Sequence, residues 1–148
     1  MIDPVRRIWL GAASGLACLL VAPPARASRD AMLAQIAAFT RGAIPQAGKI
    51  EVSLPEIVEN GNSVPVTVRV ASPMSEHDHV RRIAVFAEKN PRPDVIEAFL
   101  GPRAGRAQLS LRMRMADSQT ISAVAELSDG SFWMASVDVV VALAACLE

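Results

Sequence analysis

Residues 64–70 read Val64-Pro-Val-Thr-Val-Arg-Val70, with a valine at every second position. Strict alternation of apolar and polar residues is the period of a β-strand that buries one face. Pro65 has no backbone N–H to donate to a neighbouring strand, so we expect its side of this strand to be an edge or a strand start. The stretch therefore predicts a half-buried strand.

The same alternation continues on both sides of this stretch. Upstream, Ile50, Val52 and Leu54 alternate with polar residues, and the Asn-Gly dipeptide in Glu59-Asn60-Gly61-Asn62 predicts a turn before residue 64. Further strands are expected at 81–87, 95–100, 107–115, 120–127, 132–136 and 139–143. Many short strands separated by turn residues predict an all-β fold, an immunoglobulin-like antiparallel β-sandwich.

One short helix is expected before the strands. Met32, Ile36 and Phe39 lie on one helical face, and Ser28 or Asp30 can cap its start. Arg41 suits its last turn and Gly42 can stop it. We expect the helix to cover a sheet edge or the core, with docking to a partner as the alternative.

Composition bounds the class of protein. The chain has 148 residues, 51% of them hydrophobic, and its fifteen basic residues balance fifteen acidic ones. This length and composition favour a single domain. Without a basic block, without Tyr and with 4% aromatic residues, the sequence does not predict binding to nucleic acid.

Residues 1–27 have the pattern of an export signal. Arg6-Arg7 precedes an apolar run to Val21, and Ala25-Arg26-Ala27 resembles a cleavage site. The arginine pair favours the twin-arginine type, with an ordinary secretory signal as the alternative. Both predict a periplasmic protein that begins near Ser28, with no apolar run that spans a membrane after cleavage.

Cleavage would also remove Cys18 and leave Cys146 as the single cysteine, two residues from the end of the sequence. A single thiol in an oxidising compartment is free, paired between chains or derivatised. We divide the mature chain into a domain over 28–142 and a carrier arm over 143–148. The alternative is a disordered tail with an incidental thiol.

Other candidate chemistry is weak. Glu76-His77-Asp78-His79 has two histidines but no third convergent ligand in sequence, so we expect a polar loop, no metal and no cofactor. Phe132-Trp133-Met134 is expected in the core rather than in a binding patch. No glycine-rich phosphate loop and no distinctive carboxylate pair is present. A terminal thiol without such machinery favours a carrier over an enzyme.

Four long stretches resemble a known family: Leu54-Pro-Glu-Ile-Val-Glu-Asn-Gly-Asn-Ser-Val-Pro-Val66, Ser72-Pro-Met-Ser-Glu76, Ile83-Ala-Val-Phe-Ala-Glu-Lys-Asn-Pro91 and Ala125-Glu-Leu-Ser-Asp-Gly-Ser-Phe-Trp133. They resemble SoxY, the sulfur-carrier subunit of the periplasmic thiosulfate-oxidation (Sox) system. The resemblance implies an immunoglobulin-like sandwich, twin-arginine export and a heterodimer with a SoxZ-like companion. It further implies that Cys146 holds sulfur intermediates covalently, while sulfur-oxidation enzymes and cytochromes act on the arm.

The arm departs from the family pattern. Thiosulfate-oxidising carriers end in Gly-Gly-Cys-Gly-Gly, whereas this sequence ends in Ala144-Ala145-Cys146-Leu147-Glu148 and resembles the SoxY-related branch with an Ala-Ala-Cys-Ile-Glu arm. Alanine narrows the accessible backbone. Leu147 adds an apolar group, and the negative charge at Glu148 disfavours the thiolate.

Two other functions stay open at this point. The chain could be a non-catalytic periplasmic binding module whose C-terminal arm is structural. Alternatively, Cys146 could link two chains by a disulfide. The sequence leaves the cargo and the enzymes that load and unload the arm undetermined.

Overall fold

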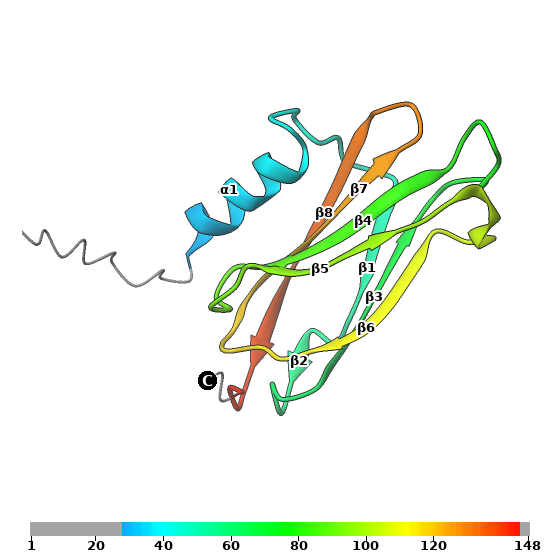
Figure 1. The fold of residues 1–148 in the computed structure, drawn as a ribbon. Helices are drawn as coiled ribbons and strands as arrows, with labels where there is room; N and C mark the ends of the chain where they lie inside the picture. Colours follow the sequence, from blue (N-terminus) through cyan, green and yellow to red (C-terminus); the bar gives the residue numbers. More distant parts are fainter. Residues whose placement is uncertain (1–27, 146–148) are drawn as a thin grey trace, which may run out of the picture.

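In the computed structural model, which describes residues 28–145, two β-sheets face one another and one helix lies outside them (Figure 1). The elements follow the chain in this order: α1 (Arg29–Phe39), β1 (Ile50–Ser53), β2 (Ile57–Val58), β3 (Val64–Val70), β4 (Val80–Ala87), β5 (Asp94–Phe99), η2 (Pro102–Ala104), β6 (Gln108–Met113), β7 (Gln119–Leu127) and β8 (Phe132–Val141). The sandwich expected from the alternating pattern is confirmed.

The smaller sheet has the order β1-β3-β6 and is antiparallel. The four alternating valines of β3 are buried, as their period requires. Pro65 lies in the middle strand of this sheet. However, β1 stops at the Ser53–Thr67 pair, so Pro65 has a neighbour only in β6. The missing donor of Pro65 is tolerated because β3 is locally an edge there.

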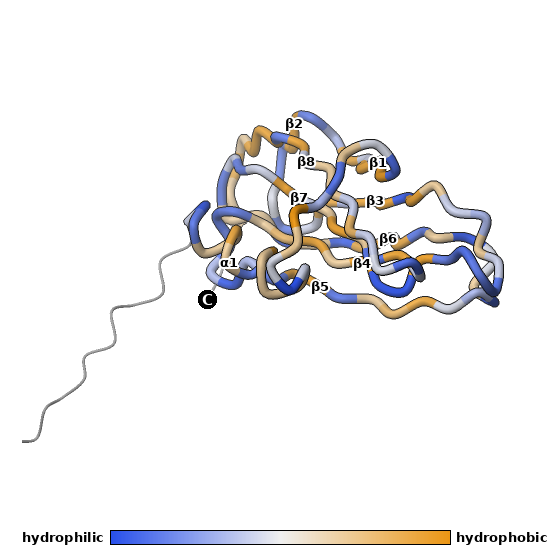
Figure 2. The backbone as a smooth tube through the Cα atoms, turned by 90° about the horizontal axis from the view of Figure 1, so that it is seen from above, coloured by the Kyte–Doolittle hydropathy of each residue, from blue (hydrophilic) through white to orange (hydrophobic). Residues whose placement is uncertain are grey.

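The larger sheet has the order β2-β8-β7-β4-β5. Its inner face packs on the smaller sheet around fully buried side chains such as Ile83, Val85 and Ile121. In Figure 2, apolar residues run along the strands, and polar residues are common in the connecting loops. This shared core joins the two sheets into one sandwich.

Two strand predictions need correction. The strands expected at 132–136 and 139–143 are one strand, β8, because Val137 and Asp138 continue the ladder with Ile121 and Thr120. The second correction is β2, which the sequence did not predict. Ile57 and Val58 pair with β8 in parallel, so the sandwich is not antiparallel throughout. Two residues are too few to produce a visible period.

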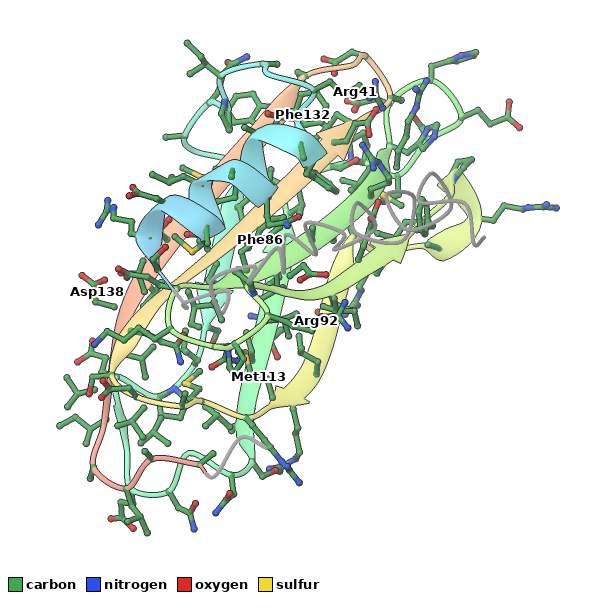
Figure 3. The ribbon with its side chains drawn as sticks, turned by 60° about the vertical axis from the view of Figure 1, so that its left-hand side comes forward. Arg41, Phe86, Arg92, Met113, Phe132 and Asp138 are labelled. Atoms are coloured by element: carbon green, nitrogen blue, oxygen red, sulfur yellow. The ribbon has the colours of Figure 1, made fainter. Side chains whose placement is uncertain are left out.

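Helix α1 covers the outer face of the larger sheet, as Figure 3 shows with Phe86 and Phe132 on the strands behind it. The buried residues of α1 are Met32, Ile36 and Phe39, the expected stripe. Ser28 is the N-cap, because its hydroxyl oxygen accepts a hydrogen bond from the Ala31 N–H at 3.1 Å. The expectation that this helix covers the core is confirmed.

Candidate functional site: the root of the C-terminal arm

The predicted carrier arm leaves the sandwich at the end of β8. Ala144 and Ala145 belong to the described structure, whereas Cys146, Leu147 and Glu148 lie outside the described residues. In Figure 1 this end of the chain lies beside β2 and the segment that precedes β3. The geometry of residues 141–145, the arm root, therefore defines the site from which Cys146 continues.

Gly61 binds the arm root from one side. Its N–H donates to the Leu143 carbonyl at 2.8 Å, and its own carbonyl accepts from the Met115 N–H at 2.9 Å. Gly61 is buried, although it lies in the polar turn that the Asn-Gly dipeptide predicted. The turn thus does more than reverse the chain, because it places a backbone donor against the arm.

Met115 binds the arm root from the other side. The Ala145 N–H donates to the Met115 carbonyl at 3.0 Å, and Ala145 is only 7% exposed. The Met115 side chain is fully buried in the core between the sheets. The backbone group that holds Ala145 is therefore itself fixed by core packing.

The loop over 114–118 also holds the end of β8. The Val141 N–H donates to the Ser118 hydroxyl at 2.9 Å, and the Ala142 N–H donates to the Val58 carbonyl at 2.8 Å. Each residue from 141 to 143, and Ala145 as well, thus has a backbone hydrogen bond to another segment. The groups that hold the root are backbone N–H and C=O groups and one serine hydroxyl.

Two buried side-chain amides, Asn90 and Gln119, hold the loop over 114–118 in place. Asn90 donates to the Arg114 carbonyl at 2.8 Å and accepts from the Ala116 N–H at 3.2 Å. Gln119 donates to the Asn90 side-chain oxygen at 3.1 Å and accepts from the Lys89 N–H at 2.9 Å. Because buried amides are costly unless satisfied, this network fixes the loop in one conformation.

One ion pair lies at the exposed rim of the loop. Lys89 and Asp117 are 3.1 Å apart. The hydrogen bond from Lys89, together with one from the Ser118 N–H, lowers the pKa of the Asp117 carboxyl below its usual value. Asp117 is therefore negatively charged at neutral pH, at the edge of the surface from which the arm leaves.

Three exposed aliphatic side chains lie on the segments that pair at the arm root. Ile57 and Val140 are neighbours across the β2–β8 pair and are 70% and 56% exposed, and Leu143 is 62% exposed. Neighbouring exposed aliphatic side chains mark an interaction surface more often than scattered ones do, and Ile57 and Val140 are such a pair.

A second cluster of charged residues lies at the other end of β7, away from the arm root. The Glu126 side chain is 3% exposed and pairs with Arg82 and with Arg41, the latter at 3.0 Å. Arg41 is not in the last turn of α1 as expected. It follows the helix with a positive φ of 55° and reaches back to the sheet. This cluster fastens α1 to the sheet.

A groove of about 450 Å³ lies between α1 and strands β4 and β5. Both of its arginines are already paired, Arg82 with Glu97 at 2.7 Å and Arg92 with Asp94 at 3.3 Å. The groove therefore lacks a free cationic group for an anionic ligand.

The histidine-containing segment is a polar loop, as expected. The ring Nδ1 of His79 lies 3.1 Å from the Ser75 carbonyl, which it engages instead of a second histidine. Within residues 28–145 no three metal-ligating side chains converge. Phe132 is buried under α1, and Trp133 and Met134 are partly buried, which agrees with the expected core role.

Comparison with known proteins identifies the family. Residues 36–146 match the family described as sulfur oxidation protein SoxY, a match that ends on Cys146. The chain belongs to the SoxY family. The sulfur carrier protein SoxY from Chlorobium limicola f thiosulfatophilum is 33% identical, with a TM-score of 0.61 over 72% of this chain and 87% of that one. The role of this SoxY-family chain is therefore that of a carrier in sulfur oxidation.

Other solved structures share only the fold with this SoxY-family chain. The superoxide reductase (neelaredoxin) from Ignicoccus hospitalis is 17% identical, with a TM-score of 0.57 over 64% of this chain and 80% of that one. A putative superoxide reductase from Thermotoga maritima is 20% identical, with a TM-score of 0.54 over 70% and 89%. No curated protein matches the sequence significantly. No helix within the described range is long and apolar enough to cross a membrane.

Sequence reasoning predicted an arm but did not find the residues that hold its root. Gly61 was expected in a turn, and Met115 at the end of a strand, without any link to the arm. Asn90 lay within a family-like stretch, but neither it nor Ser118 showed a link to the arm, because isolated polar residues in loops follow no periodic pattern. Only the three-dimensional structure brings these segments, far apart in sequence, to one place.

Proposed function

We propose that this chain carries sulfur intermediates covalently on Cys146 in the periplasm, where enzymes of sulfur oxidation act on them. The single observation that carries this proposal is that the SoxY family match includes Cys146, the last residue it covers. The arm root supports it, because hydrogen bonds to Gly61 and Met115 hold the residues just before Cys146 at one defined place on the sandwich.

The chemistry of loading follows from thiol exchange. The Cys146 thiolate attacks one sulfur of an S–S bond in the donor, and a new Cys–S–S bond forms as the old S–S bond breaks. The other half of the donor leaves as a thiolate, so no external oxidant is needed and no net oxidation occurs. Unloading transfers the bound sulfur group to a partner by the same kind of step.

The proposal includes partners and location. By family resemblance, a SoxZ-like subunit pairs with this chain, and export through residues 1–27 places it in the periplasm. The exposed aliphatic side chains of Ile57, Val140 and Leu143 offer a contact area near the arm for a partner enzyme that acts on the bound sulfur group.

The decisive experiment is mass spectrometry of the native protein from cells that oxidise sulfur compounds. We expect adducts of sulfur mass on Cys146 that a reductant removes and that are absent from a Cys146→Ser variant. Free thiol alone in the native material would reject covalent carriage. Affinity purification of the same material tests the companion subunit, and fractionation tests the location.

One observation favours a second function. The backbone of Leu143 and Ala145 is bonded to the body of the protein, as expected for a binding module with a structural arm. Full sulfur-dependent growth of the Cys146→Ser strain would favour that function. A disulfide-linked dimer on a non-reducing gel of native material, absent from the same variant, would instead favour an interchain link.

A further inference from the structure

Gly61 lies where no side chain fits. A Cβ atom at this position would be 2.5 Å from the Met115 carbonyl oxygen, 3.0 Å from the Ala145 nitrogen and 3.2 Å from Val141 Cγ1. The glycines with positive φ are Gly42, Gly48, Gly105 and Gly130, so Gly61 is not required by an unusual backbone conformation. It is required because three segments of backbone meet there.

Two of the three atoms that a Cβ would strike, the Met115 carbonyl oxygen and the Ala145 nitrogen, form a hydrogen bond that holds the arm root. The Met115 carbonyl accepts from the Ala145 N–H, and the Gly61 N–H donates to Leu143. An added methyl group must therefore separate the turn from the loop over 114–118, from residues 143–145, or from both. We call Gly61, Met115, Leu143 and Ala145, which are joined by these hydrogen bonds, the clamp. The absence of a side chain at Gly61 lets the clamp close.

The clamp determines how far the thiol can travel. Cys146 follows Ala145 directly, so its Cα stays about 3.8 Å from the anchored Ala145 Cα. If the clamp opened, Ala142 would still be bonded to Val58, and four residue steps would separate Cys146 from it, a reach of roughly 14 Å when extended. The same sequence thus gives a short arm when clamped and a long one when released.

We infer that Gly61 is a positioning residue for Cys146: it allows the clamp to close and so presents the thiol at the rim formed by residues 59–62 and 114–118. This inference rests on the proposed carrier function. It also specifies where a partner docks, because a thiol so close to its anchor is reached only by an active site that contacts this rim.

The test compares Gly61→Ala with Gly101→Ala in the full chain carrying Cys18→Ser, so that Cys146 is the one thiol. Gly101 is the matched control, since it has a φ of −134° and nothing lies within 4 Å of its added Cβ. A nitroxide label on Cys146 reports motion by electron paramagnetic resonance, and hydrogen exchange reports the Ala145 amide. Thermal melting confirms that both variants are folded.

We expect Gly61→Ala to speed exchange of the Ala145 amide at least about tenfold and to narrow the spectrum of the label. Gly101→Ala should change neither. A merely structural role of Gly61 would lower the melting temperature but leave the two local measurements at their parental values. That result overturns the inference, as does an Ala145 amide that exchanges in the parent as fast as in an unstructured peptide.

A second variant keeps the inference testable if Gly61→Ala does not fold. Ala145→Pro removes the N–H that donates to Met115 and adds no atom at position 61. The label on Cys146 should again become more mobile. An unchanged spectrum in this folded variant would show that the Ala145 hydrogen bond does not restrain the arm.

These measurements do not depend on loading a sulfur group onto Cys146, so they test the positioning role separately from the carrier function. A clamp found without sulfur adducts in native material would reject the carrier function and leave the arm geometry standing. Adducts found with an unclamped arm would reject the positioning role of Gly61 alone.

Discussion

Glu126 shows how a single residue connects two elements. Its carboxylate is buried on β7 and receives hydrogen bonds from Arg82 on β4 and from Arg41 after α1. Burial by itself would raise the pKa of Glu126, but the hydrogen bonds and positive charge of the two arginines outweigh it. The net pKa therefore lies below the ordinary value of 4.5.

This shift predicts that the protein loses stability in acid. Because the pKa of Glu126 is lower in the folded than in the unfolded chain, its contribution is fully present above about pH 4.5 and is lost as the pH falls below that value. Glu126→Gln should lower the free energy of unfolding at neutral pH by about 1–3 kcal/mol and weaken this acid dependence. Urea unfolding from pH 7 to pH 3 measures both.

Glu97→Gln is the matched control, since Glu97 also pairs with Arg82 but its side chain is 40% exposed. An exposed pair contributes little, so the change should stay below about 1 kcal/mol. Equal effects of the two substitutions would contradict the importance of burial at Glu126.

At the scale of the element, α1 depends on one aromatic contact cluster. The Phe39 ring lies 6.1 Å from the rings of both Phe86 and Phe132 in edge-to-face geometry, and the Arg82 guanidinium lies 4.3 Å from its centroid. An eleven-residue helix is marginal in isolation, so packing rather than propensity maintains it.

Removal of this contact should therefore release the helix before the sheet unfolds. Phe39→Ala is expected to reduce the stability of the docked helix by about 3–5 kcal/mol, because a large buried ring is lost. Hydrogen exchange should show lost protection across 29–39, with β4 and β7 nearly unchanged. Leu33 lies on the same helix and is 45% exposed, so Leu33→Ala should change the protection of residues 29–39 little. An equal loss of protection in β7 would show that helix and sheet unfold as one unit.

At the scale of the whole molecule, one core joins the two sheets. Val68 in the smaller sheet and Ile121 in the larger one are both fully buried and belong to the same cluster. Neither sheet can bury its inner face alone, so both should fold in a single step.

Val68→Ala tests this cooperativity. It should lower the free energy of unfolding by about 1.5–3 kcal/mol through lost burial, while fluorescence and circular dichroism keep one coincident transition. Thr67→Ala, the next residue but on the outer face of β3, should cost less than about 1 kcal/mol, because its hydroxyl contact with Ser110 is exposed. Two separate transitions for Val68→Ala would reject a shared core.

The expected strands depended on local alternation and were therefore found wherever a strand buries one face. The valines of β3 are the clearest example. The division of β8 into two strands was wrong, because the polar residue Asp138 interrupts the apolar pattern but keeps its backbone pairing with Thr120 of β7. Backbone hydrogen bonds are independent of side-chain type, so the sequence pattern does not report them.

The amino-acid sequence by itself determined the sandwich, the helix that covers it and the terminal cysteine, since each is a property of neighbouring residues in one segment. Tertiary structure alone decided where the arm leaves the protein. Gly61, Met115 and Ala145 are far apart in the chain, and their backbone groups meet only after the two sheets have packed. The physical reason is that a contact between distant segments depends on the packing of the whole core. A hydrophobic pattern within one segment carries no information about that packing.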